Sequence, residues 1–234
     1  MAGRKYSVTN MIDIAANIQR VRARIHAAES SSGREPGTVR LLAVSKGQPL
    51  AHLSAAAQAG VSAFGENYLQ EALPKIAARP DLEWHFIGRI QSNKTRPIAT
   101  HFAWVHGVDR LRIAERLSAQ RAAPDPLNVC IEVNVDAQAA KGGVPIAELG
   151  RLARAVAALP HLRLRGLMAL PVPADDRAVQ RAAFAKLARL RVELNREGLS
   201  LDTLSIGTSA GLEAAVAEGA TIVRVGTAIF GDRP

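Results

Sequence analysis

The chain contains a single cysteine among 234 residues, so it can form neither an internal disulfide nor a metal site built from several cysteines. That residue, Cys130, lies in the apolar stretch Val129–Ile131, which predicts a small buried thiol. Aromatic residues make up only 4% of the sequence, leaving few rings to stack on nucleic-acid bases. No apolar segment of signal or membrane-spanning length opens the sequence, because Met1–Thr9 is short and polar. We therefore expect a cytoplasmic protein with no membrane partner.

The sequence also lacks any block of five or more basic residues, although lysine and arginine outnumber acidic residues by 30 to 21. Such blocks mark the basic tails that bind nucleic acids. The net charge of +9 is dispersed instead, and Arg20, Arg24, Arg181 and Arg189 are interpreted as solvated faces of helices. We expect no nucleic-acid partner; the contrary hypothesis, a basic nucleic-acid-binding module, predicts a steep salt dependence of binding.

Hydrophobic residues account for 48% of the chain, enough to build a full α/β core. An amphipathic segment over residues 11–30 comes first and carries Ile14, Ile18, Val21 and Ile25 at helical spacing. Short apolar runs then alternate with alanine-rich amphipathic stretches. This alternation predicts parallel strands joined by helical crossovers.

Eight strands are predicted: Val39–Ser45, Ser62–Gly65, Glu83–Gly88, Trp104–Val108, Val129–Val135, Leu164–Leu170, Thr203–Ile206 and Ile222–Val225. The helices expected with them are Leu50–Ala59, Tyr68–Ala78, Lys94–Thr100, Arg110–Arg121, Ile146–Leu159, Arg177–Glu197 and Leu212–Glu218. Eight strand–helix units in this length indicate a single α/β domain over residues 1–234, a (β/α)8 TIM barrel with an extra N-terminal helix.

A doubly wound open sheet is the alternative fold. No Gly-x-Gly-x-x-Gly follows the first predicted strand, which argues against its dinucleotide-binding version. No linker rich in proline or glycine divides the chain, and Pro171–Pro173 is interpreted as a loop after a strand.

Lys46 ends the first apolar run, Leu41–Ser45. Alternate side chains of a strand share a face, so Leu42, Val44 and Lys46 are expected to point toward the core together. A lysine desolvated there has a lowered pKa and can form a Schiff base. A lysine at a strand end can equally extend to water, and the run alone favours that structural interpretation.

A closed barrel places the end of the eighth strand beside the end of the first. Ser209 and Thr227 then contribute hydroxyls near Lys46, Ser209 at an expected helix start, and Gly226 permits close backbone approach to an anion. Arg224 interrupts the last apolar run and needs a partner, either Glu132 or a ring nitrogen or phosphate of a ligand. Lysine, hydroxyls and arginine together describe a pyridoxal phosphate site.

Four motifs in this chain resemble the pyridoxal phosphate homeostasis proteins, the YggS/PROSC family. They are Ala43–Lys46, Phe64–Glu71, Trp84–Lys94 and Val223–Gly231, and the resemblance runs from the first helix to Arg233. It implies a fold-type III barrel like the N-terminal domain of alanine racemase. It also implies a protein that binds pyridoxal 5'-phosphate, stores or delivers it, and maintains vitamin B6 homeostasis.

The resemblance implies a role in binding the cofactor for six residues: Lys46, Asn67, Ser209, Arg224, Gly226 and Thr227. By position, the lysine would carry the Schiff base and the arginine would face the pyridine nitrogen. The asparagine would lie near the ring, and the other three would hold the phosphate. His85 is assigned either to the mouth or to the interior of the barrel, and residues 91–94 to a helix entry and the surface.

The sequence departs from the family pattern at three places. Thr208 stands where a methionine is usual, and Gly211 where an aspartate is usual. The lysine is followed by Gly47 and Gln48 rather than the usual pair resembling Thr-Lys. These changes leave the cofactor chemistry in place and alter the helix cap after strand seven and the loop at the mouth.

Two functions from different classes fit these residues. An arginine beside the pyridine nitrogen keeps that atom unprotonated, which weakens the cofactor as an electron sink. Neither tyrosine, Tyr6 or Tyr68, is placed as the acid/base of a racemase, and the chain ends at Pro234 where alanine racemase has a second domain. We therefore expect a binding protein without strong catalysis; the alternative is a small pyridoxal-phosphate enzyme, a racemase or deaminase, with Lys46 as base.

The partners expected with the cofactor are amino acids and the apo-enzymes that depend on pyridoxal phosphate. A monomer is expected, with a dimer as the alternative.

Overall fold

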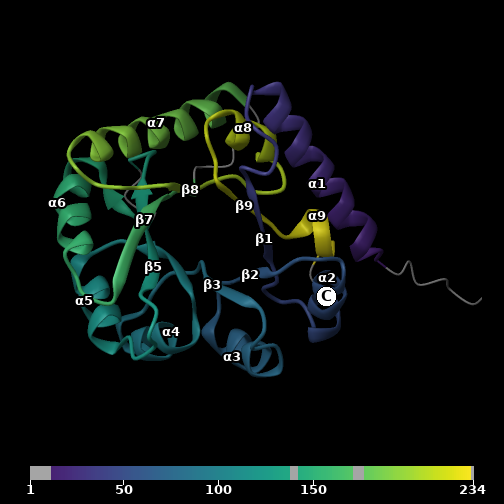
Figure 1. The fold of residues 1–234 in the computed structure, drawn as a ribbon, viewed down its shortest axis with the longest axis horizontal. Coiled ribbons are helices and arrows are strands. Elements are labelled where there is room, and N and C mark those ends of the chain that lie inside the picture. Colours follow the sequence, from purple (N-terminus) through teal and green to yellow (C-terminus); the bar gives the residue numbers. More distant parts are fainter. Residues whose placement is uncertain (1–11, 138–141, 171–176, 233–234) are drawn as a thin grey trace, which may run out of the picture.

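The computed structural model describes residues 12–137, 142–170 and 177–232 (Figure 1). The predicted helix start at Met11, the position of Tyr6 and the predicted loop Pro171–Pro173 lie outside these residues. No helix in the described parts of the chain is both long enough and apolar enough to span a bilayer.

The strands are β1 (Arg40–Val44), β2 (Ala63–Glu66), β3 (Glu83–Phe86), β4 (Trp104–Val108), β5 (Leu127–Asn134), β6 (Val144–Pro145), β7 (Leu162–Met168), β8 (Thr203–Ser205) and β9 (Ile222–Val225). The helices are α1 (Ile14–Ser31), α2 (Leu50–Gln58), α3 (Leu69–Ala78), the 3-10 turn η1 (Ser92–Lys94), α4 (Thr95–His101), α5 (Leu111–Gln120), α6 (Ile146–Ala157), α7 (Arg177–Arg196), α8 (Leu212–Ala217) and α9 (Thr227–Phe230).

Eight of these strands form one closed parallel ring, in the order β1-β2-β3-β4-β5-β7-β8-β9 and back to β1. The helices surround the ring, as Figure 1 shows. The two-residue strand β6 pairs only with β5, outside the ring. The predicted (β/α)8 barrel is therefore confirmed and the open sheet is wrong, because β9 pairs with β1 over residues 222–225.

All eight predicted strands are present, and none of their ends differs from the observed end by more than two residues. Two short elements were not predicted, β6 and α9. Helix α9 begins directly after Gly226 and is largely apolar. In the sequence it therefore looks like a continuation of strand β9. Helix α1 buries the predicted stripe, since Ile14, Ile18, Val21 and Ile25 are all covered.

The core has two layers, as a closed barrel requires. The larger layer lies between the strands and the surrounding helices. The smaller one fills the barrel interior and consists of Leu42, Ala63, Ile87, Trp104, Cys130, Met168 and Ile222. The thiol is fully buried as predicted, and burial raises its pKa to about 12.

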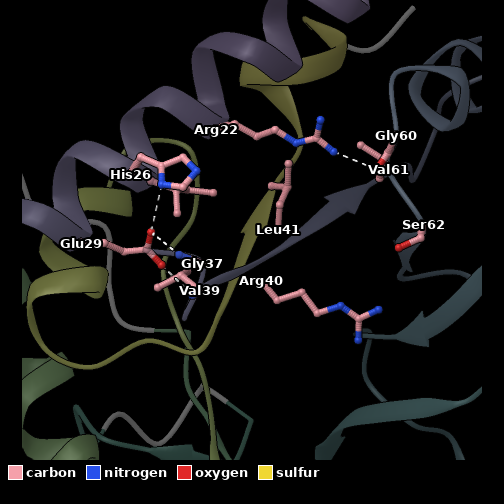
Figure 2. A pocket seen from close by; sticks show the side chains of 11 residues that line it. Arg22, His26, Glu29, Gly37, Val39, Arg40, Leu41, Gly60, Val61 and Ser62 are labelled. Atoms are coloured by element: carbon pink, nitrogen blue, oxygen red, sulfur yellow. Dashed lines mark hydrogen bonds and ion pairs between the residues drawn. The ribbon is translucent and has the colours of Figure 1, made fainter. Parts of the chain in front are cut away.

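Helix α1 also closes a cavity of about 250 Å³ against the start of β1 (Figure 2). Glu29 accepts hydrogen bonds there from the backbone N–H groups of Gly37 and Val39, at 3.0 and 2.7 Å. Arg22 donates to the carbonyl oxygens of Ala59 and Gly60. The charged groups of Arg22 and Glu29 therefore bind backbone groups of the chain itself. These hydrogen bonds hold α1 against the neighbouring loops, so we assign the cavity a structural role.

Candidate functional site

A second cavity, of about 310 Å³, opens at the carboxyl ends of the barrel strands. Its lining contains all six residues predicted from the sequence: Lys46, Asn67, Ser209, Arg224, Gly226 and Thr227. The other lining residues are Val44, Ile87, Met168, Leu170, Thr208 and Ala210. Residues from opposite ends of the chain thus meet here, at the end of the barrel where active sites of this fold lie.

The pairing of β1 with β9 brings the lysine and the arginine together. Leu42 lies opposite Arg224 in the register, and both side chains face the barrel interior. A side chain at Gly226 would put its Cβ 3.3 Å from the carbonyl oxygen of Val44, closer than most such contacts. Glycine therefore keeps the two strand ends close beside the cavity.

Lys46 lies in a turn. The strand before it was expected to end at Ser45. The strand stops at Val44, and Lys46 is half-buried and lines the cavity. The predicted shared face of Leu42, Val44 and Lys46 is consistent with this position, because two of the three line the cavity.

Polar contacts hold the backbone on both sides of Lys46, through a buried cluster before it and an exposed contact after it. The ammonium of Lys75 donates to the carbonyl oxygen of Ser45 at 2.8 Å and to Glu66 at 2.7 Å, and the hydroxyl of Ser45 donates to the same carboxylate at 2.6 Å. The N–H of Gly47 donates to Glu71 at 2.9 Å. Burial raises the pKa of Glu66 although hydrogen bonds from its partners act to lower it.

This cluster was not predicted from the sequence. Glu66 belongs to the motif Phe64–Glu71, and a carboxylate that continues a fully buried strand is a signal that it needs a cation. The identity of that cation depends on how α3 packs against the barrel, which the motif does not reveal.

Ser209 and Thr227 lie side by side in the cavity lining. The hydroxyl of Thr227 donates to Ser209 Oγ at 3.2 Å, and the N–H of Ala228 donates to the same atom at 3.3 Å. The predicted helix begins at Leu212 as expected, and Ser209 lies three residues before it, outside its first turn. The loop is held by Arg24, which donates to the carbonyl oxygen of Ser209 at 2.9 Å.

Arg24 therefore differs from the other arginines predicted to be solvated. It is half-buried and pairs with Glu213 at 2.7 Å, whereas Arg20, Arg181 and Arg189 are exposed. The N-cap of α8 is Gly211, which supplies no side-chain hydrogen bond, in agreement with the altered cap expected at this position.

Arg224 is buried, and its guanidinium is fixed by Ser205 of β8 and by Ala169, the residue that follows β7. One terminal nitrogen donates to Ser205, to the carbonyl oxygen at 2.5 Å and the hydroxyl at 2.7 Å. The other donates to the carbonyl oxygen of Ala169 at 2.9 Å. Burial lowers its pKa to about 10, so it is a cation at neutral pH. Among the described residues no ion pair joins it to Glu132, so that alternative partner is wrong.

Asn67 contributes a buried amide oxygen with no hydrogen-bond partner among the described residues. Buried polar atoms in native proteins nearly always have a partner. An unpartnered acceptor in the cavity lining therefore fits a ligand that brings a hydroxyl or other donor.

His85 lies in the barrel interior and not at the mouth. It is fully buried, stacks on Trp104 with ring centroids 5.4 Å apart, and contacts His106 at 3.0 Å. His106 in turn contacts Ser205 at 2.8 Å, and neither residue was singled out from the sequence. Residues 91–94 form a helix entry with exposed positions, as predicted.

The chain is similar to known proteins over nearly its whole length. The family model for the alanine racemase N-terminal domain matches residues 10–234. The chain is 60% identical to the pyridoxal phosphate homeostasis protein of Pseudomonas aeruginosa over 226 residues, which cover 95% of this chain and 97% of that one. It is 49% identical to the protein of the same name from Escherichia coli, covering 95% of this chain and 98% of that one.

Solved structures share the fold of this chain. PipY of Synechococcus elongatus, solved with pyridoxal phosphate bound, is 36% identical, with a TM-score of 0.83 over 94% of this chain and 100% of that one. Alanine racemase from Corynebacterium glutamicum shares the fold at 19% identity, with a TM-score of 0.67 over 92% of this chain and 62% of that one.

Proposed function

The chain belongs to the family of pyridoxal phosphate homeostasis proteins, which is built on the alanine racemase N-terminal domain, and we propose that it binds pyridoxal 5'-phosphate, stores or delivers it, and so maintains intracellular vitamin B6. The observation that carries the proposal is the convergence of Lys46, Arg224 and the hydroxyls of Ser209 and Thr227 on one cavity. The printed names of the relatives and the cofactor bound to PipY support it.

The residues of the cavity fit the parts of this cofactor. When bound, it supplies an aldehyde that reacts with amines. Lys46 would hold it covalently through its side-chain amine, and Ser209, Gly226 and Thr227 would hold its phosphate. Arg224 would donate to the pyridine nitrogen, and Asn67, with its unpartnered oxygen, would accept from a ring substituent.

We propose that the protein binds the cofactor without strong catalysis, because Arg224 keeps the pyridine nitrogen neutral and Tyr68 is not placed as an acid/base. A guanidinium with a pKa of about 10 donates a hydrogen bond without giving up its proton, so the pyridine nitrogen stays neutral. Tyr68 is 53% exposed and is not part of the cavity lining, so it is not placed as an acid/base. The alternative, a small racemase or deaminase, would have to use Lys46 itself as the base.

The finer features belong to the same proposal. We expect residues 1–234 to act as one domain in the cytoplasm, as a monomer, with a dimer as the alternative. Amino acids and apo-enzymes that need pyridoxal phosphate are the expected partners, the first as ligands of the loaded protein and the second as acceptors.

Borohydride reduction of the loaded protein, followed by peptide mass mapping, tests the attachment site. The label is expected on Lys46 and should be lost in Lys46→Ala. Lys94→Ala is the matched control, because Lys94 lies in η1 outside the cavity lining. A label on Lys94 would contradict the proposed site.

Proton exchange separates the carrier from the enzyme. Loaded protein is incubated with L-alanine, L-serine or L-threonine in deuterated water, and the α-proton signal is followed by NMR. We expect negligible exchange, together with transfer of the cofactor to an apo-enzyme. Rapid exchange that depends on Lys46 would favour the racemase or deaminase.

A further inference from the structure

A continuous row of polar side chains crosses the barrel interior, from the amino ends of the strands to the cavity. Glu83 contacts His85 Nε2 at 2.5 Å, and His85 Nδ1 contacts His106 Nε2 at 3.0 Å. His106 Nδ1 contacts Ser205 Oγ at 2.8 Å. Arg224 completes the row by donating to Ser205 Oγ at 2.7 Å. The three middle residues are completely buried.

The two ends of this row determine which way its hydrogen bonds run. A guanidinium can only donate, so Ser205 Oγ accepts from Arg224 and keeps its own proton available for His106 Nδ1. His106 then carries its proton on Nε2 and donates to His85 Nδ1. His85 carries its proton on Nε2 and donates to Glu83, a carboxylate that can only accept. Every donor therefore points from the cavity toward Glu83.

The opposite arrangement needs a charged histidine. If His106 donated to Ser205, His85 would have to donate from both ring nitrogens and would be a cation. Burial lowers the pKa of His85 despite the carboxylate beside it, and burial together with His85 and Arg224 lowers the pKa of His106 well below its usual value. Two neutral imidazoles leave only the first arrangement.

The far end of the row is anchored at the barrel floor. Burial alone would raise the pKa of Glu83, but its bonds to His85 and Arg40 lower it to about 2. Arg40 pairs with Glu83 at 2.7 Å. In Figure 2 the side chain of Arg40 points away from Glu29. The row thus joins a cation at the cavity to an anion at the opposite end of the barrel through neutral groups.

We propose that Glu83, His85, His106 and Ser205 are positioning residues that fix the guanidinium of Arg224 toward the bound cofactor. This inference rests on the proposed function, because it assumes that Arg224 meets the pyridine nitrogen. Hydrogen bonds in such a chain polarise one another, so a change at the floor of the barrel alters the donor at the cavity. Positions far from the cofactor therefore adjust how it is held.

Side-chain nitrogen NMR of 15N-labelled protein tests the direction of the chain before any cofactor is added. Both His85 and His106 are expected as neutral tautomers protonated on Nε2. Pyridoxal phosphate should then shift the His106 resonances, whereas inorganic phosphate, which would engage only Ser209 and Thr227, should leave them in place. A cationic ring, or an Nδ1-protonated tautomer at either position, overturns the proposal.

The variant Glu83→Gln tests the coupling, because the amide can still accept from His85 but carries no charge. We expect an upfield shift of the His85 Nε2 proton, a displaced visible absorbance band of the loaded protein, and cofactor affinity lower by roughly threefold, as for loss of charge assistance to one hydrogen bond. Asp202→Asn is the matched control: it weakens another floor ion pair, to Arg165, outside the row. An unchanged band and affinity in Glu83→Gln overturn the coupling.

Ser205→Ala gives a second measurement that keeps the backbone carbonyl bond to Arg224. It should weaken cofactor binding by about tenfold, since one bond to a charged group is lost and the row is cut. Wild-type affinity in this variant overturns the positioning role. A wild-type protein without any visible band after incubation with pyridoxal phosphate overturns the proposed function instead, so the two failures are distinguishable.

Discussion

On one side of the cavity the backbone is held by buried charges, and on the other by partly exposed ones. The lysine side comprises residues 45–47 with Glu66 and Lys75, whose ion pair at 2.7 Å is almost completely covered. The hydroxyl side comprises residues 207–211 and 226–228, held by Arg24 and Glu213, whose side chains are 36% and 53% exposed. Buried pairs are costly to break and exposed pairs contribute little, so the two sides should tolerate change very differently.

The largest effect is expected from Lys75→Met, which removes the cation of the lysine side. Glu66 would be left buried without its partner, and the free energy of unfolding should fall by about 3–5 kcal/mol. Urea or guanidinium unfolding measures this loss. The double variant Glu66→Leu, Lys75→Met is the control, because it replaces the pair by apolar groups and should regain most of the stability.

The cost of Lys75→Met should shrink as the pH is lowered. Burial already raises the pKa of Glu66, and removing Lys75 raises it further. A carboxyl group whose pKa is higher in the folded state opposes folding above that pKa, and this penalty disappears as the pH falls and the group is protonated. A loss of stability that stays constant from neutral pH to about pH 4 would show that Glu66 is not the group left unpaired.

An intermediate effect is expected on the hydroxyl side from Ser209→Ala, measured as binding and not as stability. The cofactor phosphate would lose one hydrogen bond to a charged acceptor, which should weaken binding by about 1–3 kcal/mol. Titration followed by absorbance, with pyridoxal and pyridoxal phosphate in parallel, checks this. Wild-type protein that binds both compounds equally well would contradict the phosphate-binding role.

The smallest effect is expected from Arg24→Met. This variant breaks the partly exposed pair with Glu213 and the bond to the carbonyl oxygen of Ser209, and should lower the free energy of unfolding by less than about 1 kcal/mol. Arg154→Met is the matched control, since Arg154 pairs with Glu197 away from the cavity. A loss as large as that of Lys75→Met would remove the contrast between the two sides.

The fold was predictable because its signal is local. Each strand of the barrel is a short apolar run, and the one-sided stripe of α1 follows from the spacing of four residues. Two charges that interrupt apolar runs, Lys46 and Arg224, were visible for the same reason. Asn67 has no such signal, and only the motif around it pointed to the cavity.

The partners of these residues were not predictable. Lys75 reaches Ser45 from α3, and Ser205 joins Arg224 to His106 across three strands, so each contact depends on three-dimensional packing. The supposed ion pair of Arg224 with Glu132 failed because carbonyl oxygens of the barrel satisfy the guanidinium instead. The sequence shows which side chains need a partner, and the packing decides which group supplies it.

The closure of β9 onto β1 has a consequence for how the protein is made. Lys46 is synthesised early, but half of the cavity lining comes from residues 208–227, so a growing chain cannot build the cavity until β9 has left the ribosome. Pairing of strands so distant in sequence also carries a loop-closure cost, and non-local pairing of this kind slows folding. If the cofactor binds in this cavity as proposed, only the completed barrel can take it up, and a chain stalled before β9 would carry Lys46 without the rest of the site.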